Sequence, residues 1–527
     1  MRKKLVISLG VIGTLLLLLS LDLSAQEEKW LWIKQFGTGS MDHSCALAVA
    51  KAGQVHICGY TEGSLESGGN QGSVDAFVTK QDATGNMVWV RQFGTKESDQ
   101  ALGVIADDQD NVYLTGNTYG AFAGYKNAGS ADVFLAKFDT SGRKLWVKQF
   151  GTQESDYGTC IARNSGGDIY LAGETFGKLG NKSLGESDVF LAKYDYTGET
   201  SWIKQFGTNC VDHCTALLAT EDGEYIVGDT CGEFANNKSC GDTDAFLAKY
   251  DPYGEQLWVR QFGTKGYDFV QSLARDKDNN LYVLGDTKSA FPENKNAGLT
   301  DIFLAKFNPS GQLVWLTEFG TKDDDHSKEI VVDDLGNIYL TGDTKGAFAG
   351  NAGAGNSDVF LVKFDSDGHK LWVKQFGTVD NDFASGLIQD NLGNLQVSGD
   401  TFGRMGDIPN KGGCDVFLAD FKGTRTAIYR QEGLVIEGGS KGYVEPGKNE
   451  ELDITLIPRS NDKVKVTVTD GTGQVVWSKE GKVTNNQQEF ICWNGINTQG
   501  VLSKAGLYQV QVSGGGFEVK EKFALVE

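Results

Sequence analysis

Residues 132–152 read DVFLAKFDTSGRKLWVKQFGT, and this stretch recurs along the chain. Copies of its first half begin at Asp75, Asp132, Asp188, Asp244, Asp301, Asp358 and Asp415. Its second half is marked by tryptophans 56 or 57 residues apart, which are Trp32, Trp89, Trp146, Trp202, Trp258, Trp315 and Trp372. Seven copies in nearly constant register indicate a repeat architecture.

Each repeat predicts four short β-strands separated by turns. After Trp89 the expected strands are residues 101–106, 111–116, 133–138 and 145–150. Asp107 and Asp139 open the first and last of the three connections, since an aspartate side chain can bond the backbone two residues on, and the middle connection is a longer Gly/Asn-rich loop. Val133–Ala136 is apolar on both faces, as a strand covered from both sides must be. Four strands in a unit of this length predict one blade of a β-propeller.

The two ends of the array predict how it closes. Six of the tryptophan strands follow a turn that opens with Asp or Asn and ends with Gly, whereas no such strand follows Asp415–Phe421. The missing strand occurs at the opposite end, as Trp30–Gly37. We therefore expect the N-terminal strand to complete the last blade, which removes two unpaired sheet edges.

Residues 1–25 predict a signal peptide. Basic residues at 2–4 precede an apolar run from Leu5 to Leu19, and Leu23-Ser24-Ala25 resembles a cleavage site. The run is short for a membrane span, and no later segment is apolar enough to be one. We expect the mature protein to be exported, either extracellular or on the cell surface.

The composition restricts the classes of partner. With 40% apolar and 11% aromatic residues the chain has a folding composition. A formal net charge of −21 repels nucleic-acid phosphates and anionic membrane surfaces. We therefore expect neither as a partner.

Nine cysteines in an exported chain predict disulfides, with at least one thiol left over. Cys45 and Cys58 flank a predicted turn at similar distances, so they would lie nearly opposite one another in a hairpin. A second bridging set is expected within one repeat, from Cys210, Cys214, Cys231 and Cys240. With His213 these could instead hold zinc, but their spacings match no common zinc module.

The recurring pattern Asp-Val-Phe-Leu-Ala-Lys-Phe-Asp-x-x-Gly-x-x-x-Trp-x-x-x-Phe-Gly-Thr resembles the SBBP family, the bacterial beta-propeller repeat of exported proteins. The resemblance covers roughly residues 30–421. It implies an extracellular propeller, a fold that by itself implies no activity.

The repeat stops at Gly423, and a linker over 423–447 and a β-sandwich over 448–527 are expected. Trp493-Asn494-Gly495, Gln499-Gly500 and Gly506-Leu507-Tyr508 resemble the FlgD-type Ig-like domain. The closing segment from Gly506 to Val526 also resembles type IX secretion sorting domains. The predicted fold is therefore all-β: a seven-bladed β-propeller over 26–422 closed by its N-terminal strand, followed by a small Ig-like β-sandwich.

An aspartate recurs shortly after each Phe-Gly-Thr. These ring aspartates are Asp42, Asp99, Asp156, Asp212, Asp268, Asp325 and Asp382. An enzyme site breaks symmetry because its acid, base and nucleophile have different roles, so a residue repeated in every blade favours a structural role. The alternative is a calcium site at the mouth of the channel. We predict no other metal or cofactor.

His43, His213 and His326 each follow a ring aspartate and break the sevenfold symmetry. The spacing from Asp139 to Trp146 resembles the tryptophan-docking motifs of quinoprotein dehydrogenases, but those have eight blades and usually a vicinal cysteine pair. The sequence holds no Gly-x-Ser-x-Gly, His-Glu-x-x-His or phosphate-loop motif. We expect no catalysis, with a quinoprotein-type enzyme as the remote alternative.

Variation between repeats falls in Gly/Asn-rich loops such as 119–131 and 291–300, where a partner would bind. We predict an interaction scaffold for surface or extracellular proteins. The alternative is a carbohydrate-binding protein that presents loop aromatics to glycans, although these rings could instead pack the loop base. The candidates are Tyr119, Phe122, Phe176, Phe234, Phe291 and Phe348.

Overall fold

The computed structural model describes residues 30–525 except 51–52, 68, 181–183, 334–335, 352, 391–392, 406–407, 422–426, 432–433, 438–443, 445–451, 457–461, 484–488, 500 and 515. The predicted signal peptide lies outside the described residues. Within them the fold is all-β, as predicted, and it contains no helix that could cross a membrane.

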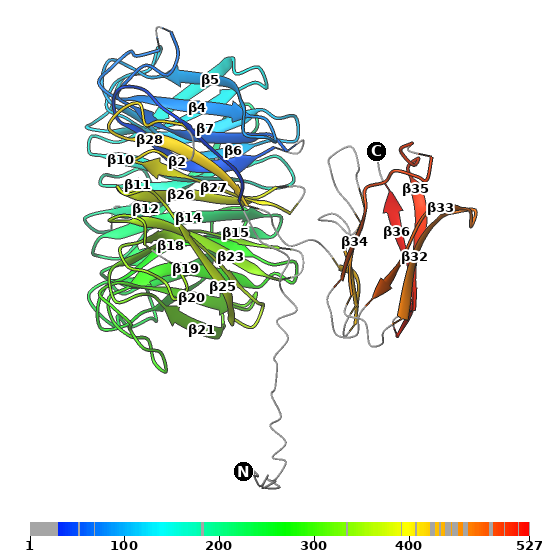
Figure 1. The fold of residues 1–527 in the computed structure, drawn as a ribbon. Helices are drawn as coiled ribbons and strands as arrows, with labels where there is room; N and C mark the ends of the chain where they lie inside the picture. Colours follow the sequence, from blue (N-terminus) through cyan, green and yellow to red (C-terminus); the bar gives the residue numbers. More distant parts are fainter. Residues whose placement is uncertain are drawn as a thin grey trace, which may run out of the picture.

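Seven four-stranded antiparallel sheets repeat one order in the described part of the chain, and we call them blades 1 to 7 (Figure 1). The first strands are β2 (Asp42–Val49), β6 (Asp99–Ala106), β10 (Asp156–Arg163), β14 (Asp212–Thr220), β18 (Asp268–Arg275), β22 (Asp325–Val332) and β26 (Asp382–Gln389). The second strands are β3 (Val55–Thr61), β7 (Val112–Thr118), β11 (Ile169–Thr175), β15 (Gly223–Thr230), β19 (Leu281–Thr287), β23 (Ile338–Thr344) and β27 (Leu395–Thr401).

The remaining two strands of each blade carry the repeated sequence itself. The third strands are β4 (Asp75–Gln81), β8 (Asp132–Phe138), β12 (Asp188–Tyr194), β16 (Asp244–Tyr250), β20 (Asp301–Phe307), β24 (Asp358–Phe364) and β28 (Asp415–Phe421). The fourth strands are β5 (Met87–Phe93), β9 (Lys144–Phe150), β13 (Thr200–Phe206), β17 (Gln256–Phe262), β21 (Leu313–Phe319), β25 (Lys370–Phe376) and, in blade 7, β1 (Trp30–Phe36).

Burial follows the position of a strand in its blade. The third strands are buried along almost their whole length, whereas the fourth strands begin with exposed residues. Each first strand contacts the first strand of the next blade, and β26 contacts β2. The first strands are therefore innermost, and the apolar second and third strands form the core between neighbouring blades.

The two ends of the repeat array meet in blade 7. β1 pairs antiparallel with β28, with Ile33 opposite Ala419. Trp30 packs against Phe376 of blade 6 and Phe421 of its own blade, at ring-centroid distances of 4.1 Å and 5.0 Å. The N-terminal strand thus covers the edge that β28 would otherwise expose.

A glycine in each turn before a fourth strand packs on the tryptophan of the preceding blade. Gly142 has a φ of +79°, and a Cβ atom there would lie 2.9 Å from Cδ2 of Trp89. The Trp89 Nε1–H donates to the Thr140 carbonyl at 3.2 Å. Only glycine meets both the conformation and the close approach, so the Asp139-to-Trp146 spacing serves packing between blades.

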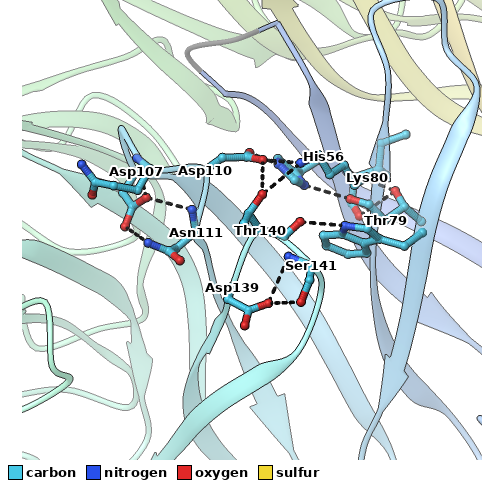
Figure 2. A network of polar contacts seen from close by, with 12 residues as sticks. His56, Thr79, Lys80, Asp107, Asp110, Asn111, Asp139, Thr140 and Ser141 are labelled. Atoms are coloured by element: carbon cyan, nitrogen blue, oxygen red, sulfur yellow. Dashed lines mark hydrogen bonds and ion pairs between the residues drawn. The ribbon is translucent and has the colours of Figure 1, made fainter.

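A polar network joins blades 1 and 2 at the same end of the strands as these turns, and it includes Thr140 (Figure 2). The fully buried His56 places Nε2 2.8 Å from Oδ1 of Asp110 and Nδ1 3.1 Å from the Thr79 carbonyl oxygen. Lys80 forms an ion pair with the other oxygen of Asp110. The two partners hold the pKa of Asp110 at about 2, despite the opposing effect of burial. The Asp110 carboxylate of blade 2 thus binds two buried side chains of blade 1, His56 and Lys80.

The cysteine predictions hold only in part. Cys210 and Cys231 form a disulfide within blade 4. The predicted Cys45–Cys58 bridge is wrong, because a β-bulge between Ser44 and Ala46 places Ala46 opposite Cys58 and both thiols are free. Cys240 is also a free thiol. Cys214 is free as well, and its Sγ lies 3.5 Å from Sγ of Cys160 across the junction of blades 3 and 4.

The C-terminal strands form two further four-stranded sheets, in the orders β29-β30-β31-β34 and β33-β32-β35-β36. The strands are β29 (Ala427–Gln431), β30 (Leu434–Glu437), β31 (Leu452–Leu456), β32 (Asp462–Asp470), β33 (Val475–Val483), β34 (Glu489–Trp493), β35 (Gly506–Gly514) and β36 (Phe517–Leu525). Buried residues of both sheets, including Ile454, Val466 and Trp493, form one core, as in a β-sandwich. The predicted linker over 423–447 is too long, because β29 and β30 lie within it and β30 pairs with β31.

Candidate functional site

One cross-strand pair in each blade lies directly beside a ring aspartate, at the end where first strands begin and second strands finish. We call these residues the rim. The pairs are His43 with Tyr60, Gln100 with Asn117, Tyr157 with Glu174, His213 with Asp229, Phe269 with Asp286, His326 with Asp343, and Phe383 with Asp400. The rim combines imidazoles, aromatic rings and carboxylates. A His–Asp pair occurs in blades 4 and 6 and a Phe–Asp pair in blades 5 and 7, whereas the pairs of blades 1, 2 and 3 each occur once.

The ring aspartates position the rim. Each is fully buried, and one carboxylate oxygen accepts the backbone N–H of a threonine four residues earlier, at 2.5–2.6 Å. Because successive side chains of a strand point to opposite faces, burying the aspartate turns the next residue toward the other face. The ring aspartates therefore fix the turns on which the rim is built.

The calcium role of the ring aspartates stays a prediction, and their surroundings are as follows. Burial raises the pKa of each, and a second aspartate, such as Asp75 beside Asp99, raises it further. In the described residues, groups of three or more potential metal ligands within 4.8 Å of one another occur at His43, Asp400 and Cys414 and at Asp365, Asp367 and His369. Neither group contains a ring aspartate.

His213 lies between carboxyl groups of two blades. Its Nδ1 is 3.0 Å from Oδ1 of Asp229 in its own blade, and this bond, with the nearby Glu174, raises the pKa of His213 to about 9. Burial raises the pKa of Glu174 to about 7, although the attraction of His213 opposes the change. The two groups together titrate across neutral pH.

His326 and His43 take different carboxylate partners. Nδ1 of His326 is 3.4 Å from Oδ2 of Asp286 in the preceding blade, and this bond raises the pKa of His326. Burial raises the pKa of the nearby Asp343 to about 6, against the attraction of His326. Nδ1 of His43 is 2.7 Å from Oδ2 of Asp400. Each symmetry-breaking histidine therefore has its own carboxylate, and the structure places the three in different blade junctions.

The half-buried Glu174 predicts a pH-dependent stability. A carboxyl whose pKa is raised in the folded state costs stability once it ionises, so the cost is absent below about pH 4.5 and complete above about pH 7. We expect Glu174→Gln to stabilise the protein by about 2 kcal/mol at pH 8 and to have little effect at pH 4. Thermal unfolding at both pH values measures the difference, with the exposed Glu186→Gln as the control. An equal effect of Glu174→Gln at both pH values would contradict the prediction.

Two of the six loop aromatics are available at the surface. Tyr119 and Phe176 are 40% and 43% exposed. Tyr157 lies 6.2 Å from Phe176 between ring centroids, and its hydroxyl forms a hydrogen bond that raises the pKa of Tyr119. The cluster Tyr119–Tyr157–Phe176 therefore spans blades 2 and 3.

The other four aromatics belong to the core. The prediction that they face a ligand is wrong, because each is at most 6% exposed and packs on the phenylalanine of its own third strand. Their backbone N–H groups also donate to the Gln or Glu of the adjacent fourth strand. These four are Phe122, Phe234, Phe291 and Phe348.

Sequence reasoning missed most of the rim. It singled out the histidines after ring aspartates but not Tyr157, Phe269 and Phe383, which hold the same position in other blades. It also missed Glu174 and Asp400, which precede the threonine that ends each second strand. An alignment of the seven repeats would have found these residues. They occupy positions that vary between repeats and that lie next to an invariant aspartate or threonine.

Family models match parts of the chain. A model described as a beta-propeller repeat, SBBP, matches residues 88–123, 257–292 and 314–349. A FlgD Ig-like domain model matches residues 445–516. Both agree with the resemblances carried by the repeated sequence and by the C-terminal Trp-Asn-Gly segment.

Curated relatives match a smaller part. The chain is 29% identical over 169 residues to the regulatory protein FlaEY of Caulobacter vibrioides, covering 29% of this chain and 18% of that protein. It is 28% identical over 180 residues to the uncharacterised WD repeat-containing protein L264 of Acanthamoeba polyphaga mimivirus, covering 29% of this chain and 13% of that protein. The chain thus matches less than a fifth of the length of either relative.

Among solved structures, the chain is similar to PorZ, a bacterial surface component of the type-IX secretion system of Porphyromonas gingivalis. The identity is 13% and the TM-score 0.39, covering 91% of this chain and 59% of PorZ. YCF48 bound to D1 peptide has 9% identity and a TM-score of 0.39, covering 74% of this chain and 97% of that one. The repeated sheets, the matched repeats and the matched C-terminal domain together identify the chain as one that carries SBBP beta-propeller repeats and a FlgD Ig-like domain.

Proposed function

We propose that this protein is an exported, non-catalytic scaffold whose seven blades form one ring closed by β1, and that its rim binds a protein partner. The arrangement of the rim supports this proposal. The His213 and His326 side chains are 40% and 45% exposed, while Asp229 and Asp286 beneath them are 5% exposed. Exposed Phe383 adds an aromatic ring to the same layer. Aromatic side chains are enriched at protein-protein interfaces, and the rim holds them on a rigid frame.

A binding role fits this geometry better than a catalytic one. Each rim histidine is held by its own carboxylate, and the three histidines belong to blades 1, 4 and 6. Acid–base catalysis needs such groups to converge on one reacting atom. The rim instead spreads them over several contact points, as a broad docking surface does.

Cross-linking mass spectrometry on intact cells that produce the protein tests the proposal. We expect links from the rim to one or two surface proteins, and we expect the variant Tyr157→Ser/Phe269→Ser/Phe383→Ser to lose them. The matched control is Val88→Ser/Leu257→Ser/Val314→Ser, which removes three exposed apolar side chains from fourth strands. Retention of the same links by the rim variant, or their equal loss in the control, would contradict the proposal.

A carbohydrate-binding role is the second candidate, and the Tyr119–Tyr157–Phe176 cluster favours it. Exposed aromatic rings next to hydroxyl groups can pack on the apolar faces of sugar rings while accepting and donating hydrogen bonds. We expect Tyr119→Ala/Phe176→Ala to abolish retention by isolated envelope polysaccharide without changing the unfolding temperature, if this candidate holds. Unchanged retention would exclude the cluster as the glycan site.

A further inference from the structure

The junction between blades 7 and 1 holds a third potential ligand beside its imidazole and carboxylate. Nδ1 of His43 lies 2.7 Å from Oδ2 of Asp400. The buried Cys414 lies beside them, and its Sγ, one ring nitrogen of His43 and one carboxylate oxygen of Asp400 are all within 4.8 Å of one another. An imidazole, a carboxylate and a thiol that converge in this way form the mixed N, O and S donor set of protein zinc sites.

The surrounding contacts orient each of these groups. Oδ1 of Asp400 accepts the Ser44 backbone N–H at 2.8 Å and the Ser44 hydroxyl at 2.9 Å, which leaves Oδ2 facing His43. The Asp42 N–H donates to the Cys414 carbonyl at 3.1 Å, and Met41 forms a parallel bridge with Cys414. The His43 ring also packs against Tyr60, with 4.9 Å between ring centroids and 38° between the ring planes. Such second contacts are what fix ligand geometry in metal sites.

Another junction provides a natural comparison. Between blades 5 and 6, His326 lies beside Asp286, and Ser327 holds Oδ1 of Asp286 through its N–H and hydroxyl. The position of Cys414 is there taken by Thr300. An imidazole, a carboxylate and a serine thus meet in the same way at both junctions. The junction between blades 7 and 1 differs by the thiol of Cys414.

We propose that His43, Asp400 and Cys414 bind one divalent transition-metal ion of the zinc class, with a solvent molecule completing the coordination. Binding replaces the direct His43–Asp400 hydrogen bond by two metal–ligand bonds. The ring proton of His43 then resides on Nε2, and the Cys414 thiol releases its proton to solvent as the metal–sulfur bond forms. No electron transfer is involved. The ion would connect His43 of β2 to Asp400 of β27 and to Cys414, the residue that precedes β28.

Cobalt titration of the full-length mature protein, with its Cys210–Cys231 disulfide intact, tests the proposal, because a thiolate bound to Co²⁺ gives a charge-transfer absorption in the near ultraviolet. We expect one equivalent of Co²⁺ to produce this absorption and Zn²⁺ to displace it. Cys414→Ser should abolish it, and Ser44→Ala should weaken Zn²⁺ binding about 10- to 100-fold. Ser187 and Ser357 occupy the equivalent position in other blades, so Cys414→Ser is expected to fold.

Two controls make the outcome decisive. His326→Ala removes the imidazole of the junction with Thr300 and should leave the cobalt spectrum unchanged. Cys160→Ser removes a thiol of the Cys160–Cys214 pair and should also leave it unchanged. Absence of the absorption in the unmodified protein, its persistence in Cys414→Ser, or its loss in Cys160→Ser would each overturn the proposal.

Discussion

A chain that begins at Gly37, and so lacks β1, is expected to unfold at a much lower temperature than the mature protein and to self-associate. Its blade 7 would expose the whole edge of β28, and unpaired edges template pairing with other chains. The deletion also removes the Trp30 contacts with Phe376 and Phe421. It further removes the hydrogen bond of 3.0 Å from Gln35 to buried Asp415.

The matched control is a chain that begins at Lys29, which keeps all of β1. Thermal unfolding gives the stability of both chains, and light scattering gives their state of association. Addition of a synthetic peptide of residues 29–37 should restore the unfolding temperature of the shortened chain. A shortened chain that stays monomeric and equally stable would contradict both the pairing of β1 and the closed ring.

Asp110→Gly is expected to destabilise the protein by about 3 kcal/mol at neutral pH, because it leaves buried His56 and Lys80 without their shared carboxylate. Glycine is the appropriate replacement, since Asp110 has a φ of +62° and glycines occupy the equivalent turn in four other blades. Glycine adopts this backbone conformation without strain, so the substitution removes the carboxylate and leaves the turn intact. Urea unfolding at pH 7 measures the loss.

Asn279→Gly is the matched control for the turn. Asn279 has a φ of +64° at the equivalent position of blade 5, where its side chain accepts a hydrogen bond from Arg275 at the surface. We expect a change of less than about 1 kcal/mol there. Because the pKa of Asp110 is lowered to about 2, its contribution is present at neutral pH and is lost as pH falls from about 4 toward 2. An effect of Asp110→Gly no larger than that of Asn279→Gly would contradict the assigned role.

The blades could be predicted from the sequence because each repeat contains the residue patterns of its own strands and turns. The Asp139–Gly142 turn and the buried β8 follow from local chemistry that any single copy shows. The partnership of β1 with β28 was also predictable, since the last repeat lacks a strand that the N-terminus supplies. These features depend on periodicity and local propensity, which a sequence displays directly.

The site was less predictable, because it depends on which residues meet across blade junctions. The approach of Asp400 to His43 joins residues more than 350 positions apart, and no local pattern encodes it. The bulge after Ser44 shifts Cys45 out of register with Cys58, which residue spacing alone does not show. Phe122 and Tyr119 look alike in a loop, yet one enters the core and the other does not.

The pairing of β1 with β28 also constrains the order in which the molecule can fold. Blades 1 to 6 are each built from strands that follow one another directly, so each can form as soon as its own strands are available. Blade 7 must join residues separated by 380 positions, as Gln35 and Asp415 are. During synthesis from the N-terminus, β1 therefore waits unpaired until nearly the whole array has emerged. The last step of assembly is therefore the capture of β1 by β28, and until that step both strands expose an edge that can pair with another chain.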